Sequence, residues 1–505
     1  METPLQGFYK NKTIFLTGGS GFLGKVTIEK LLRSTDVKRI YVLIRSKKGK
    51  DVQDRIAAWN EDVVFSEVLK SKPESLKKIV PISGDCVEPD LGISKGDREL
   101  LAKEVQVVLH GAATVRFTEP LHLALDINTR AARLMLELAR EMTRLEAYVH
   151  VSTAFSNCIT DHIKEEFYPE HLTCGVDKVL AMRKILSDEL LDGLSPLLVG
   201  KYPNTYTYTK ALAEQVLQQE AGDLPVCVYR PGIIVASYKE PVEGWIDNIY
   251  GPTVLLYATA LGYIRITPLN TDANANILPI DYCVNLFLAL AWRTAEENAT
   301  RKRNGILPPP PPIYNYVPSK SNMLTWGGFR DNSLARSKDF PFEQMKWLPF
   351  LQCTTNFWVF KVLSFLYHLV PGFLIDVVLR FKGQKPRAVQ VYKKYHNAMY
   401  ILAFFGASTW HFDTNNTDNI WQSLTPQDQQ LFQFDMSTLD WDDYFYRSTC
   451  AMRIYLGKED PSPAGIKRAQ RVRARYLIFH RLLQFVLYGG ALAILWTVLK
   501  SLIGF

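Results

Sequence analysis

The glycine-rich segment Thr17–Gly24 constrains the fold of this chain more than any other feature of its sequence. Its order is Thr-Gly-Gly-Ser-Gly-Phe-Leu-Gly, between a run that predicts a strand and a run that predicts a helix. The spacing G-x-x-G-x-x-G is typical of a turn that holds a dinucleotide pyrophosphate at a helix N-terminus. We expect Gly18 to allow the tight turn, Gly21 to let the backbone approach the phosphates, and Gly24 to let helix and sheet pack closely. The predicted cofactor-binding residues of the segment are Thr17, Gly18, Gly21, Phe22, Leu23 and Gly24.

Strand and helix patterns alternate through residues 1–300. The predicted strands are Lys12–Thr17, Arg39–Ile44, Lys78–Ser83, Val105–Leu109 and Ala147–Val151, with Val226–Arg230 and Ile277–Ile280 as later strands of the same unit. Helical spacing is clear in Val26–Arg33 and Thr129–Arg140. Strands separated by helices predict an α/β fold with a doubly wound parallel Rossmann sheet.

The turn after the second predicted strand indicates which dinucleotide is bound. NAD enzymes tend to place Asp or Glu there to hold the ribose hydroxyls. This chain has Arg45-Ser46-Lys47-Lys48, with no carboxylate in the turn. Arg45 can pair with a 2′-phosphate through two hydrogen bonds, and Lys48 adds positive potential. The turn therefore favours NADPH as the cofactor, and an ordinary solvated basic turn is the alternative.

The ends of later strands complete the predicted cofactor site. Asp85 follows the third strand and could accept a hydrogen bond from the adenine amino group, or act only as a turn aspartate. Ala112 and Ala113 follow the fourth strand, where small side chains let a cofactor pass close to the backbone. Pro231 precedes Gly232 in a segment that either shapes the nicotinamide pocket or is a simple turn.

Tyr206 and Lys210 form the predicted catalytic pair, because residues four apart share one face of a helix. A tyrosine normally titrates near ~10. A neighbouring ammonium stabilises the phenolate, so we expect Lys210 to lower the pKa of Tyr206. Tyr206 would then donate a proton to a carbonyl oxygen while hydride reaches the carbon, and Lys210 would also hold the nicotinamide ribose. Tyr208 is a rival phenol, but it should face elsewhere on the helix.

Ser152 and Thr153 follow the fifth predicted strand. A hydroxyl at the carboxyl edge of the sheet can bond and polarise a substrate oxygen. Both residues are candidates, and a strand-end cap is the alternative for either. Thr153 is preferred because its register resembles that of the hydroxyl in the short-chain dehydrogenase pattern. Asn128 precedes a predicted helix, where it would cap the helix or anchor a water behind Lys210.

Composition excludes several other classes of function. The net charge of +8 over 505 residues is modest, so we expect no nucleic-acid partner. Seven scattered cysteines without a C-x-x-C pair indicate a reduced compartment, without a disulfide framework or a metal site. The first residues lack the apolar segment of a signal peptide, which places the bulk of the chain in the cytosol.

The second half of the chain predicts further regions and a membrane anchor. The predicted division is a reductase domain at 1–300, a linker with Pro308–Pro312 at 301–354, a helical domain at 355–460, a basic juxtamembrane segment at 461–481 and a transmembrane tail anchor at 482–503. Leu482–Leu499 is apolar and free of charge, near the lower limit of roughly 17–25 residues for a spanning helix. Its basic flank should lie on the cytosolic side of the membrane.

A second apolar run, Phe357–Phe381, is less suited to spanning a membrane. It contains Lys361, His368, Pro371 and Asp376, and ionisable side chains are costly in lipid. We expect a buried or interfacial helical hairpin here.

The ordered set of motifs resembles the extended short-chain dehydrogenases, and more closely the fatty acyl-CoA reductases. The motifs are Thr17–Gly24, His110–Ala113, Val151–Ala154, Tyr206–Lys210 and Arg230–Gly232, together with Thr409–Asp413 in the C-terminal domain. The resemblance implies that a long-chain acyl-CoA is reduced by two NADPH, through an aldehyde, to a primary fatty alcohol. Two apolar stretches could wall an acyl tunnel or be ordinary core: one contains Phe167, Tyr168, Leu180 and Met182, and the other is Ile249–Ile266.

Two other functions use the same motifs. A membrane-bound sterol or 3β-hydroxysteroid dehydrogenase would use the Tyr–Lys pair, but usually with NAD and an acidic residue near position 45, where this chain has arginine. A non-catalytic NADP-binding scaffold would be expected to lose the pair. The tail anchor fits the endoplasmic reticulum or the peroxisome, with the former preferred, and a homo-oligomer is left open.

Overall fold

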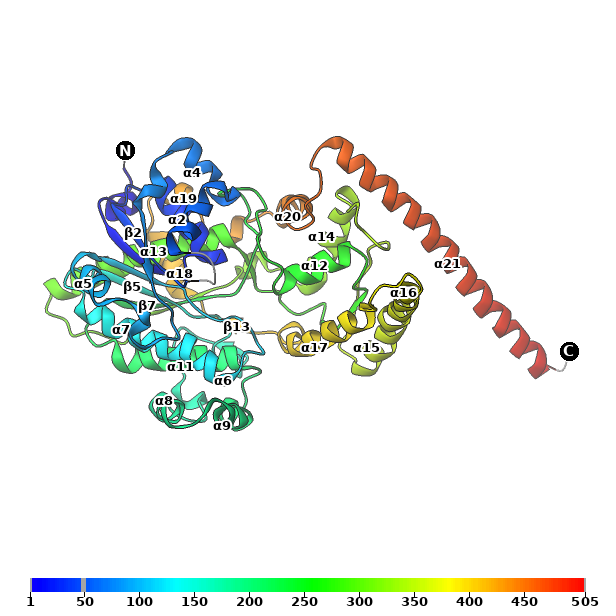
Figure 1. Ribbon diagram of the computed structural model, residues 1–505, viewed down its shortest axis with the longest axis horizontal. Coiled ribbons are helices and arrows are strands. Elements are labelled where there is room, and N and C mark those ends of the chain that lie inside the picture. Colours follow the sequence, from blue (N-terminus) through cyan, green and yellow to red (C-terminus); the bar gives the residue numbers. More distant parts are fainter. Residues whose placement is uncertain (1, 47–50, 504–505) are drawn as a thin grey trace. The chain divides into compact units, whose positions relative to one another are not determined.

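Seven parallel strands form the central sheet of the computed structural model, which describes residues 2–46 and 51–503 (Figure 1). The strands are β1 (Thr13–Thr17), β2 (Arg39–Ile44), β3 (Ile79–Ser83), β4 (Val107–His110), β5 (Ala147–Val151), β7 (Val226–Pro231) and β11 (Ile313–Tyr316). Their order is β11-β7-β5-β4-β1-β2-β3, and every neighbouring pair is parallel. The chain starts at β1, winds outward to β3, and then returns to fill the other half, so the predicted doubly wound Rossmann sheet is confirmed.

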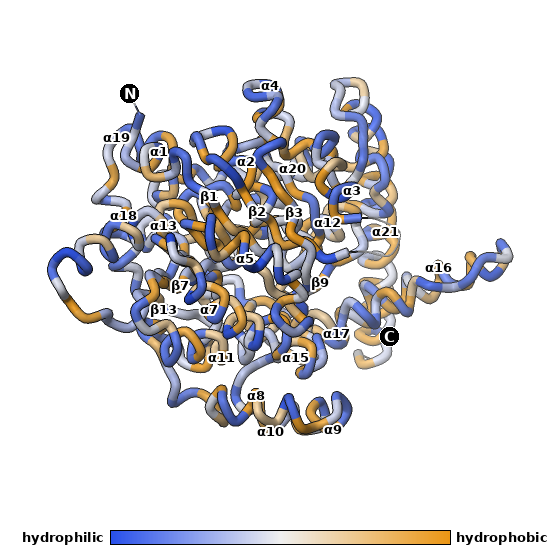
Figure 2. Tube along the Cα trace, turned by 60° about the vertical axis from the view of Figure 1, so that its left-hand side comes forward, coloured by the Kyte–Doolittle hydropathy of each residue, from blue (hydrophilic) through white to orange (hydrophobic). Residues whose placement is uncertain are grey.

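Helices cover both faces of this sheet. The helices of the same unit are α1 (Pro4–Tyr9), α2 (Phe22–Ser34), α3 (Val52–Ala57), α4 (Ser66–Ser71), α5 (Lys95–Glu104), α6 (Leu121–Ala124), α7 (Ala131–Glu141), α8 (Val176–Ile185), α9 (Asp188–Gly193), α10 (Ser195–Val199), α11 (Thr205–Glu220), α13 (Ile280–Arg303), α18 (Asn415–Ser423) and α19 (Pro426–Leu431), of which α8, α9 and α10 pack on other helices. α2 packs on α13, and α7 packs on α11. The strands between them are almost wholly buried, and Figure 2 shows them as a hydrophobic centre. Burial on both faces explains why the strands are continuous apolar runs rather than alternating ones.

The last strand of the sheet differs from the prediction. Ile277–Ile280 does form a strand, β10 (Ile277–Pro279), but it pairs with β8 (Ile233–Val235) in a separate two-stranded sheet. The seventh strand is β11, directly after the proline run, within the range predicted as a linker. The N–H of Val228 donates to the carbonyl of Pro312 at 2.9 Å, so the run leads straight into the sheet edge. β11 has only four residues and directly follows five prolines, so its pattern of apolar residues is too short to predict a strand from the sequence.

The chain divides into two compact units that are interleaved in sequence. The first contains Met1–Trp245, Asn274–Leu324 and Ser408–Leu439, and the second contains the intervening segments and the C-terminus. In the first unit, β13 (His411–Phe412) pairs with β6 (His162–Ile163) in a separate two-stranded sheet, which brings a late segment of the chain into the reductase unit. The compact units therefore cut across the consecutive ranges predicted from the sequence, because this pairing joins residues far apart in the chain.

The second unit is mostly helical. Its helices are α12 (Pro252–Ala260), α14 (Trp326–Asp339), α15 (Phe357–Ser364), α16 (Val370–Phe381), α17 (Ala388–Ala407), α20 (Trp441–Tyr455) and α21 (Pro463–Ile503). A π-helical turn, Phe365–Leu369, joins α15 to α16 without a break. A short pair, β9 (Ile266–Thr267) with β12 (Gln352–Cys353), completes the unit. Within the described residues, two helical stretches are long and apolar enough to cross a membrane: Phe357–Phe381 and Pro463–Leu502.

Candidate active site

Two of the three motif glycines are required by geometry at the turn between β1 and α2. Gly18 has a φ of +76°, and a Cβ there would lie 2.8 Å from the backbone nitrogen of Ala112. A Cβ on Gly24 would lie 2.3 Å from the carbonyl oxygen of Gly18. The N–H of Gly21 donates to that same carbonyl at 2.9 Å. The loop therefore needs glycine at 18 for its turn and at 24 for close packing of α2.

The N-terminus of α2 is suited to a phosphate group. The helix begins at Phe22 without a side-chain cap, and its first turn, which is described throughout, contains no acidic residue. Its first N–H groups thus have no side-chain acceptor and can bind an anion. Phe22 stacks on Trp245 with 5.2 Å between ring centroids, and the carbonyl of Leu23 accepts from Thr27. These residues fit a nicotinamide dinucleotide, whose pyrophosphate the loop would hold.

Thr17 fixes the loop rather than projecting from it. Its hydroxyl lies 2.7 Å from Nδ1 of His110 and accepts from the N–H of Ala112 at 3.2 Å. Burial lowers the pKa of His110 to about 3, so this histidine is neutral. The end of β1 is thereby tied to the Gly111–Ala113 segment after β4, along which a cofactor would pass.

Two arginines lie beside the glycine loop, and only one was predicted. Arg45 is 59% exposed, with its guanidinium 3.9 Å from the carboxylate of Asp85. Arg55, on α3, donates to the carbonyl of Arg45 and lies 3.4 Å from the hydroxyl of Ser20. Burial, and then the charge of Arg45, lowers the pKa of Arg55. Lys48 lies outside the described residues.

The sequence gives no local signal for Arg55, because it stands ten residues beyond Arg45 on a separate helix. Its positive charge is the one property in the sequence that is consistent with binding a phosphate. Asp85 accepts from the N–H of Val87 at 3.2 Å, as a turn aspartate does, and this leaves its predicted adenine contact a prediction.

Asn128 secures the segment after β4 to the catalytic helix. Its Oδ1 accepts from the N–H of Thr114 at 2.9 Å, and its Nδ2 donates to the hydroxyl of Thr209 on α11 at 3.0 Å. The residue lies inside a π-helical turn, Leu125–Arg130, so it does not cap a helix as one alternative held. Such turns are frequent at functional sites, since they re-aim side chains.

Tyr206, Thr153 and Lys210 are brought together at the carboxyl end of β5. α11 starts after Asn204, whose side chain accepts from the N–H of Thr207 and fixes the first turn that carries Tyr206. The tyrosine ring stacks on Phe117, and its hydroxyl is hydrogen-bonded to Thr153. One helical turn later, the ammonium of Lys210 donates to the carbonyl of Val151 at 2.7 Å.

Burial, rather than Lys210, sets the pKa of Tyr206. Burial raises that pKa to about 12, and the hydrogen bond with Thr153 acts in the opposite direction. The expectation of a lowered pKa is therefore wrong for this arrangement, because burial disfavours the charged phenolate and outweighs the influence that lowers the pKa. Burial lowers the pKa of Lys210 itself to about 8, although nearby Glu214 opposes the shift. At neutral pH the phenol is protonated and can act as a proton donor.

Ser152 belongs to a buried polar network behind the site. Its hydroxyl donates to Glu214 at 2.5 Å, and Glu214 also receives two hydrogen bonds from Arg230, at 2.9 and 2.6 Å. The ion pair is almost fully buried, with side-chain exposures of 0% and 3%. Ser156 and Asn157 donate to the same carboxylate. The network joins α11 to β5 and β7, which favours Thr153 over Ser152 as the hydroxyl available to substrate.

Tyr208 lies in the core, as its position on the helix predicts. It is completely buried against Tyr202, and its hydroxyl has no hydrogen-bond partner among the described residues. At the end of β7, the carbonyl of Pro231 accepts from the N–H of Ala154 at 2.9 Å. Pro231 thus adjoins the strand end that carries Thr153.

The two predicted tunnel stretches lie in different compact units. Leu180 is buried in the core of the first unit, and Phe167 and Met182 pack against it, as ordinary core residues do. Ile249–Ile266 belongs to the second unit, mainly as α12. A role for either in enclosing an acyl chain stays a prediction.

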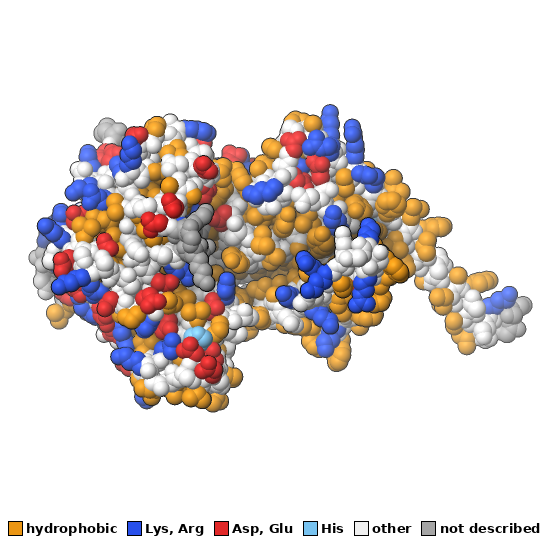
Figure 3. All heavy atoms as spheres, in the orientation of Figure 1, with side chains coloured by type: hydrophobic (Ala, Val, Ile, Leu, Met, Phe, Trp, Pro, Cys, Tyr) orange, Lys and Arg blue, Asp and Glu red, His pale blue; other side chains and the backbone are white. Residues whose placement is uncertain are grey.

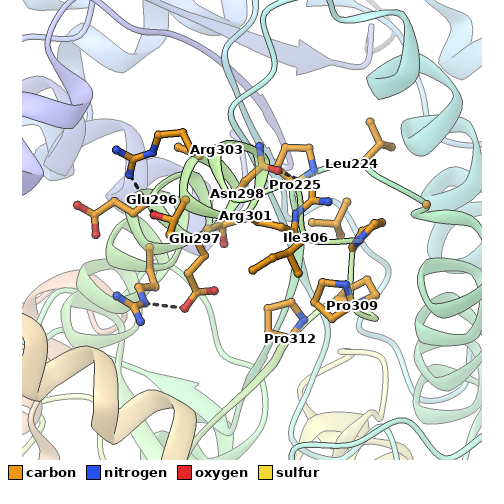
Figure 4. Close-up of a pocket in the computed structure, with 18 residues that line it drawn as sticks. Leu224, Pro225, Glu296, Glu297, Asn298, Arg301, Arg303, Ile306, Pro309 and Pro312 are labelled. Carbon is orange, nitrogen blue, oxygen red and sulfur yellow. Dashed lines mark hydrogen bonds and ion pairs between the residues drawn. The ribbon is translucent and has the colours of Figure 1, made fainter.

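A separate cavity of about 710 Å³ lies at the opposite edge of the sheet, where β7 begins (Figure 4). Residues of the last turns of α13 and the proline run line it, including Arg301, Ile306 and Pro309. Since Tyr206 and Thr153 lie beyond the carboxyl ends of the strands, this cavity is distinct from the catalytic site.

The fold and these groups define an NAD(P)-dependent reductase of the extended short-chain dehydrogenase type. A family model described as male sterility protein matches residues 16–287, and a second of the same description matches residues 367–459. The chain is 41% identical over 501 residues to fatty acyl-CoA reductase wat of Drosophila melanogaster, covering 99% of this chain and 94% of that protein. It is 36% identical to fatty acyl-CoA reductase 2 of Mus musculus, covering 98% and 93%. The chain belongs to the fatty acyl-CoA reductase family.

Solved structures agree on the fold. The terminal R domain of the myxalamid biosynthetic pathway has a TM-score of 0.56 at 19% identity, covering 88% of this chain and 91% of its own. A thiolation-reductase di-domain from an archaeal non-ribosomal peptide synthetase has a TM-score of 0.51 at 17% identity, covering 91% and 79%. At these identities the likeness concerns the fold alone.

Proposed function

We propose that this protein is an alcohol-forming reductase that converts a long-chain fatty acyl-CoA to the primary alcohol with two NADPH, through an aldehyde. Membership of the fatty acyl-CoA reductase family supports the substrate and product. The observation that carries the chemistry is the hydrogen-bonded pair of Tyr206 and Thr153 beside Lys210, at the carboxyl end of β5. We assign this chemistry to the first compact unit.

The bound nicotinamide would supply hydride to the carbonyl carbon in each of the two reductions. In the first, the C–S bond breaks and CoA leaves as a thiolate, which takes up a proton, to give the aldehyde. In the second, the aldehyde oxygen becomes the hydroxyl of the alcohol. Tyr206 is protonated at neutral pH and donates its proton to that oxygen, and Thr153 supports the developing charge by a second hydrogen bond. Lys210, whose ammonium lies at the same strand end, would hold the nicotinamide ribose.

The preference for NADPH over NADH rests on the basic groups at the glycine loop. Arg55 places a guanidinium group beside Ser20 and donates to the backbone carbonyl of Arg45, and the phosphate of the adenosine ribose would lie between these two arginines. Bidentate arginine–phosphate pairs are among the stronger hydrogen-bonded contacts. The carboxylate of Asp85 is already within 3.9 Å of Arg45, which disfavours its use as an NAD-type ribose acceptor.

We also propose that the protein is anchored by Leu482–Leu499, with its catalytic unit in the cytosol and the endoplasmic reticulum as its membrane. The support is the exposed apolar surface of this part of α21 and the basic cluster before it, of which Arg471, Arg473 and Arg475 are members. Protease protection of tagged termini in isolated microsomes and peroxisomes tests both orientation and organelle.

The decisive assay supplies NADPH and a panel of acyl-CoAs to the detergent-solubilised protein, follows NADPH consumption, and identifies products by gas chromatography. We expect fatty alcohol with two NADPH consumed per acyl-CoA. A ratio of one with aldehyde accumulating would contradict an alcohol-forming reaction. Turnover of sterols with NAD, and none of acyl-CoA, would instead support the steroid dehydrogenase alternative.

A further inference from the structure

In the helical stretch Phe357–Phe381, polar side chains lie on the buried side and apolar side chains on the exposed side, which is the reverse of a helix in a soluble protein. Its buried side is formed by Phe360, Ser364, His368 and Gly372, so a hydroxyl and an imidazole face inward. Its outer side is apolar and aromatic, with exposures between 56% and 88% for Trp358, Val362, Phe365, Phe373, Leu374 and Phe381. Water-facing helices show the opposite pattern, and an exposed apolar face of this extent marks an interaction surface.

The inner side of this stretch is held by polar contacts that a membrane span could not keep. Nε2 of His368 accepts from the N–H of Arg265 at 3.0 Å, and its Nδ1 lies 2.9 Å from His396 on α17. Arg265 also donates to the carbonyl of Tyr367 at 2.7 Å. α17, which runs along this side, exposes Lys393 and its neighbour to solvent. The inner side of the stretch therefore packs on the rest of the second unit through polar contacts, and only the outer side is open to lipid. A helix that crosses a membrane is instead surrounded by lipid or by other membrane helices.

Positive charge borders the apolar face. Residues 354–410 contain seven Lys and Arg but a single acidic residue, Asp376. The carboxylate of Asp376 is used internally, since it accepts from the N–H groups of Arg387 and the two residues after it. Lys382 and Lys385 are exposed just beyond the end of α16. Figure 3 shows hydrophobic side chains over this part of the second unit, with Lys and Arg beside them. Such a rim complements anionic lipid headgroups.

The apolar face is continuous with the candidate membrane helix at the C-terminus. The ring of Phe350 lies 5.5 Å from that of Tyr367, in the π-helical turn, and 6.1 Å from that of His480 on α21. His480 is also bonded to the indole of Trp347 at 3.2 Å. The charge-free stretch of α21 begins two residues later, at Leu482. A single aromatic side chain thus connects the two apolar helices within the second unit.

We propose that the outer face of Phe357–Phe381 is a second membrane contact, which rests in the headgroup region of an anionic bilayer without crossing it. The apolar side chains enter the acyl boundary, and the basic rim meets the headgroups. This inference concerns the second unit alone and does not depend on the proposed reaction.

The test incorporates the photocrosslinker p-benzoylphenylalanine, one site at a time, in the full-length protein reconstituted into vesicles of phosphatidylcholine and phosphatidylserine. The proposed contact is probed at Phe365 and Phe373, where an aromatic residue replaces an aromatic residue. Leu495 in α21 is the positive control. Leu197 on α10, an equally hydrophobic and 71% exposed residue of the first unit, is the negative control. Mass spectrometry after illumination identifies lipid or protein adducts.

We expect lipid adducts at Phe365 and Phe373 as well as at Leu495, and none at Leu197. Adducts to a second copy of the chain at Phe365 and Phe373 would identify a self-association surface and overturn the proposal. No adduct there, with lipid adducts at Leu495, would overturn it too. The combined K382Q and K385Q variant should lower the lipid-adduct yield several-fold, and only in vesicles that contain phosphatidylserine; an unchanged yield would refute the role of the basic rim.

Discussion

At the scale of single residues, Tyr206 and Tyr208 offer a matched pair on one helix. Tyr206→Phe removes the proton donor, and general acid catalysis of this kind contributes about 10²- to 10⁴-fold, so we expect a loss of that order in kcat. Tyr208→Phe removes a buried hydroxyl without a partner among the described residues and should leave activity near the parent level. Steady-state NADPH oxidation with a saturating acyl-CoA measures both. A comparable loss in the Tyr208 variant would indicate damage to the helix rather than to the chemistry.

The low pKa of Lys210 predicts a pH dependence. The ammonium is charged below its pKa of about 8 and neutral above it, so an activity that needs the charge declines as pH rises through about 8. The profile of kcat/KM reports groups of the free enzyme, and its alkaline limb should lie there. Lys210→Arg keeps the charge at all these pH values, so any activity it retains should lack the limb. A parent profile that stays flat to about pH 10, the usual range of lysine, would contradict this role.

The arginines beside the glycine loop predict cofactor selectivity. Removing a hydrogen bond to a charged group costs about 1.5–3 kcal/mol, which corresponds to roughly a tenfold to hundredfold weaker binding. Arg45→Ala and Arg55→Ala should weaken NADPH binding by this factor and leave NADH binding unchanged. Arg293→Ala, on α13 at the opposite edge of the sheet, is the control. Fluorescence titration with each dinucleotide distinguishes the outcomes, and an equal loss for both would point to a structural effect.

At the scale of elements, replacing glycine by alanine should have opposite effects in two places: at the join between β1 and α2, and at an exposed position in helix α1. Gly24→Ala places a methyl group against backbone atoms of the loop, which cannot move aside cheaply, and should destabilise the protein by about 1–3 kcal/mol and impair dinucleotide binding. Gly7→Ala, in α1, meets nothing within 4 Å and should stabilise by up to about 1 kcal/mol. Thermal unfolding compares the two. Equal effects would contradict the close packing at Gly24.

The elements around the site show what a sequence can and cannot predict. β2 and β5 were predicted to the residue, because strands buried on both faces are continuous apolar runs between polar turns. Tyr206, Lys210 and Thr153 were brought together as expected, since short spacing fixes the face of a helix. Glu214 and Arg230 were not foreseen as a buried pair, because sixteen residues and a helix–strand junction separate them. The spacing of apolar residues along a helix or a strand does not predict an ion pair between two different elements.

At the scale of the whole molecule, the chain passes between the two compact units five times, at 245/246, 273/274, 324/325, 407/408 and 439/440. The sequence predicts consecutive domains, because a change of composition marks a linker but does not show that the chain later re-enters a unit that it has left. The return of residues 408–439 depends on the pairing of β13 with β6, whose two-residue strands carry no recognisable pattern.

The membrane-facing features together predict how a shortened chain behaves. Deletion of residues 482–505 removes the proposed tail anchor but keeps the face of Phe357–Phe381. We expect the shortened protein to be released from membranes by alkaline carbonate, yet to sediment with anionic vesicles at low salt, because weak interfacial binding adds to headgroup attraction. The same deletion with Trp358→Ser and Phe373→Ser should stay in the supernatant. Equal sedimentation of both shortened proteins would contradict a contribution from that face.

The contact of His480 with Trp347 has a further consequence for how the protein moves. His480 stands two residues before Leu482, which is about 3 Å along the helix, given a rise of 1.5 Å per residue. Once the tail is in the bilayer, no flexible tether separates the folded unit from the lipid surface. An anchored protein would then meet partners that reside in the membrane by diffusion in two dimensions. Those encounters would be confined to a thin layer, where lateral diffusion and the local density of lipid-soluble molecules set the rate.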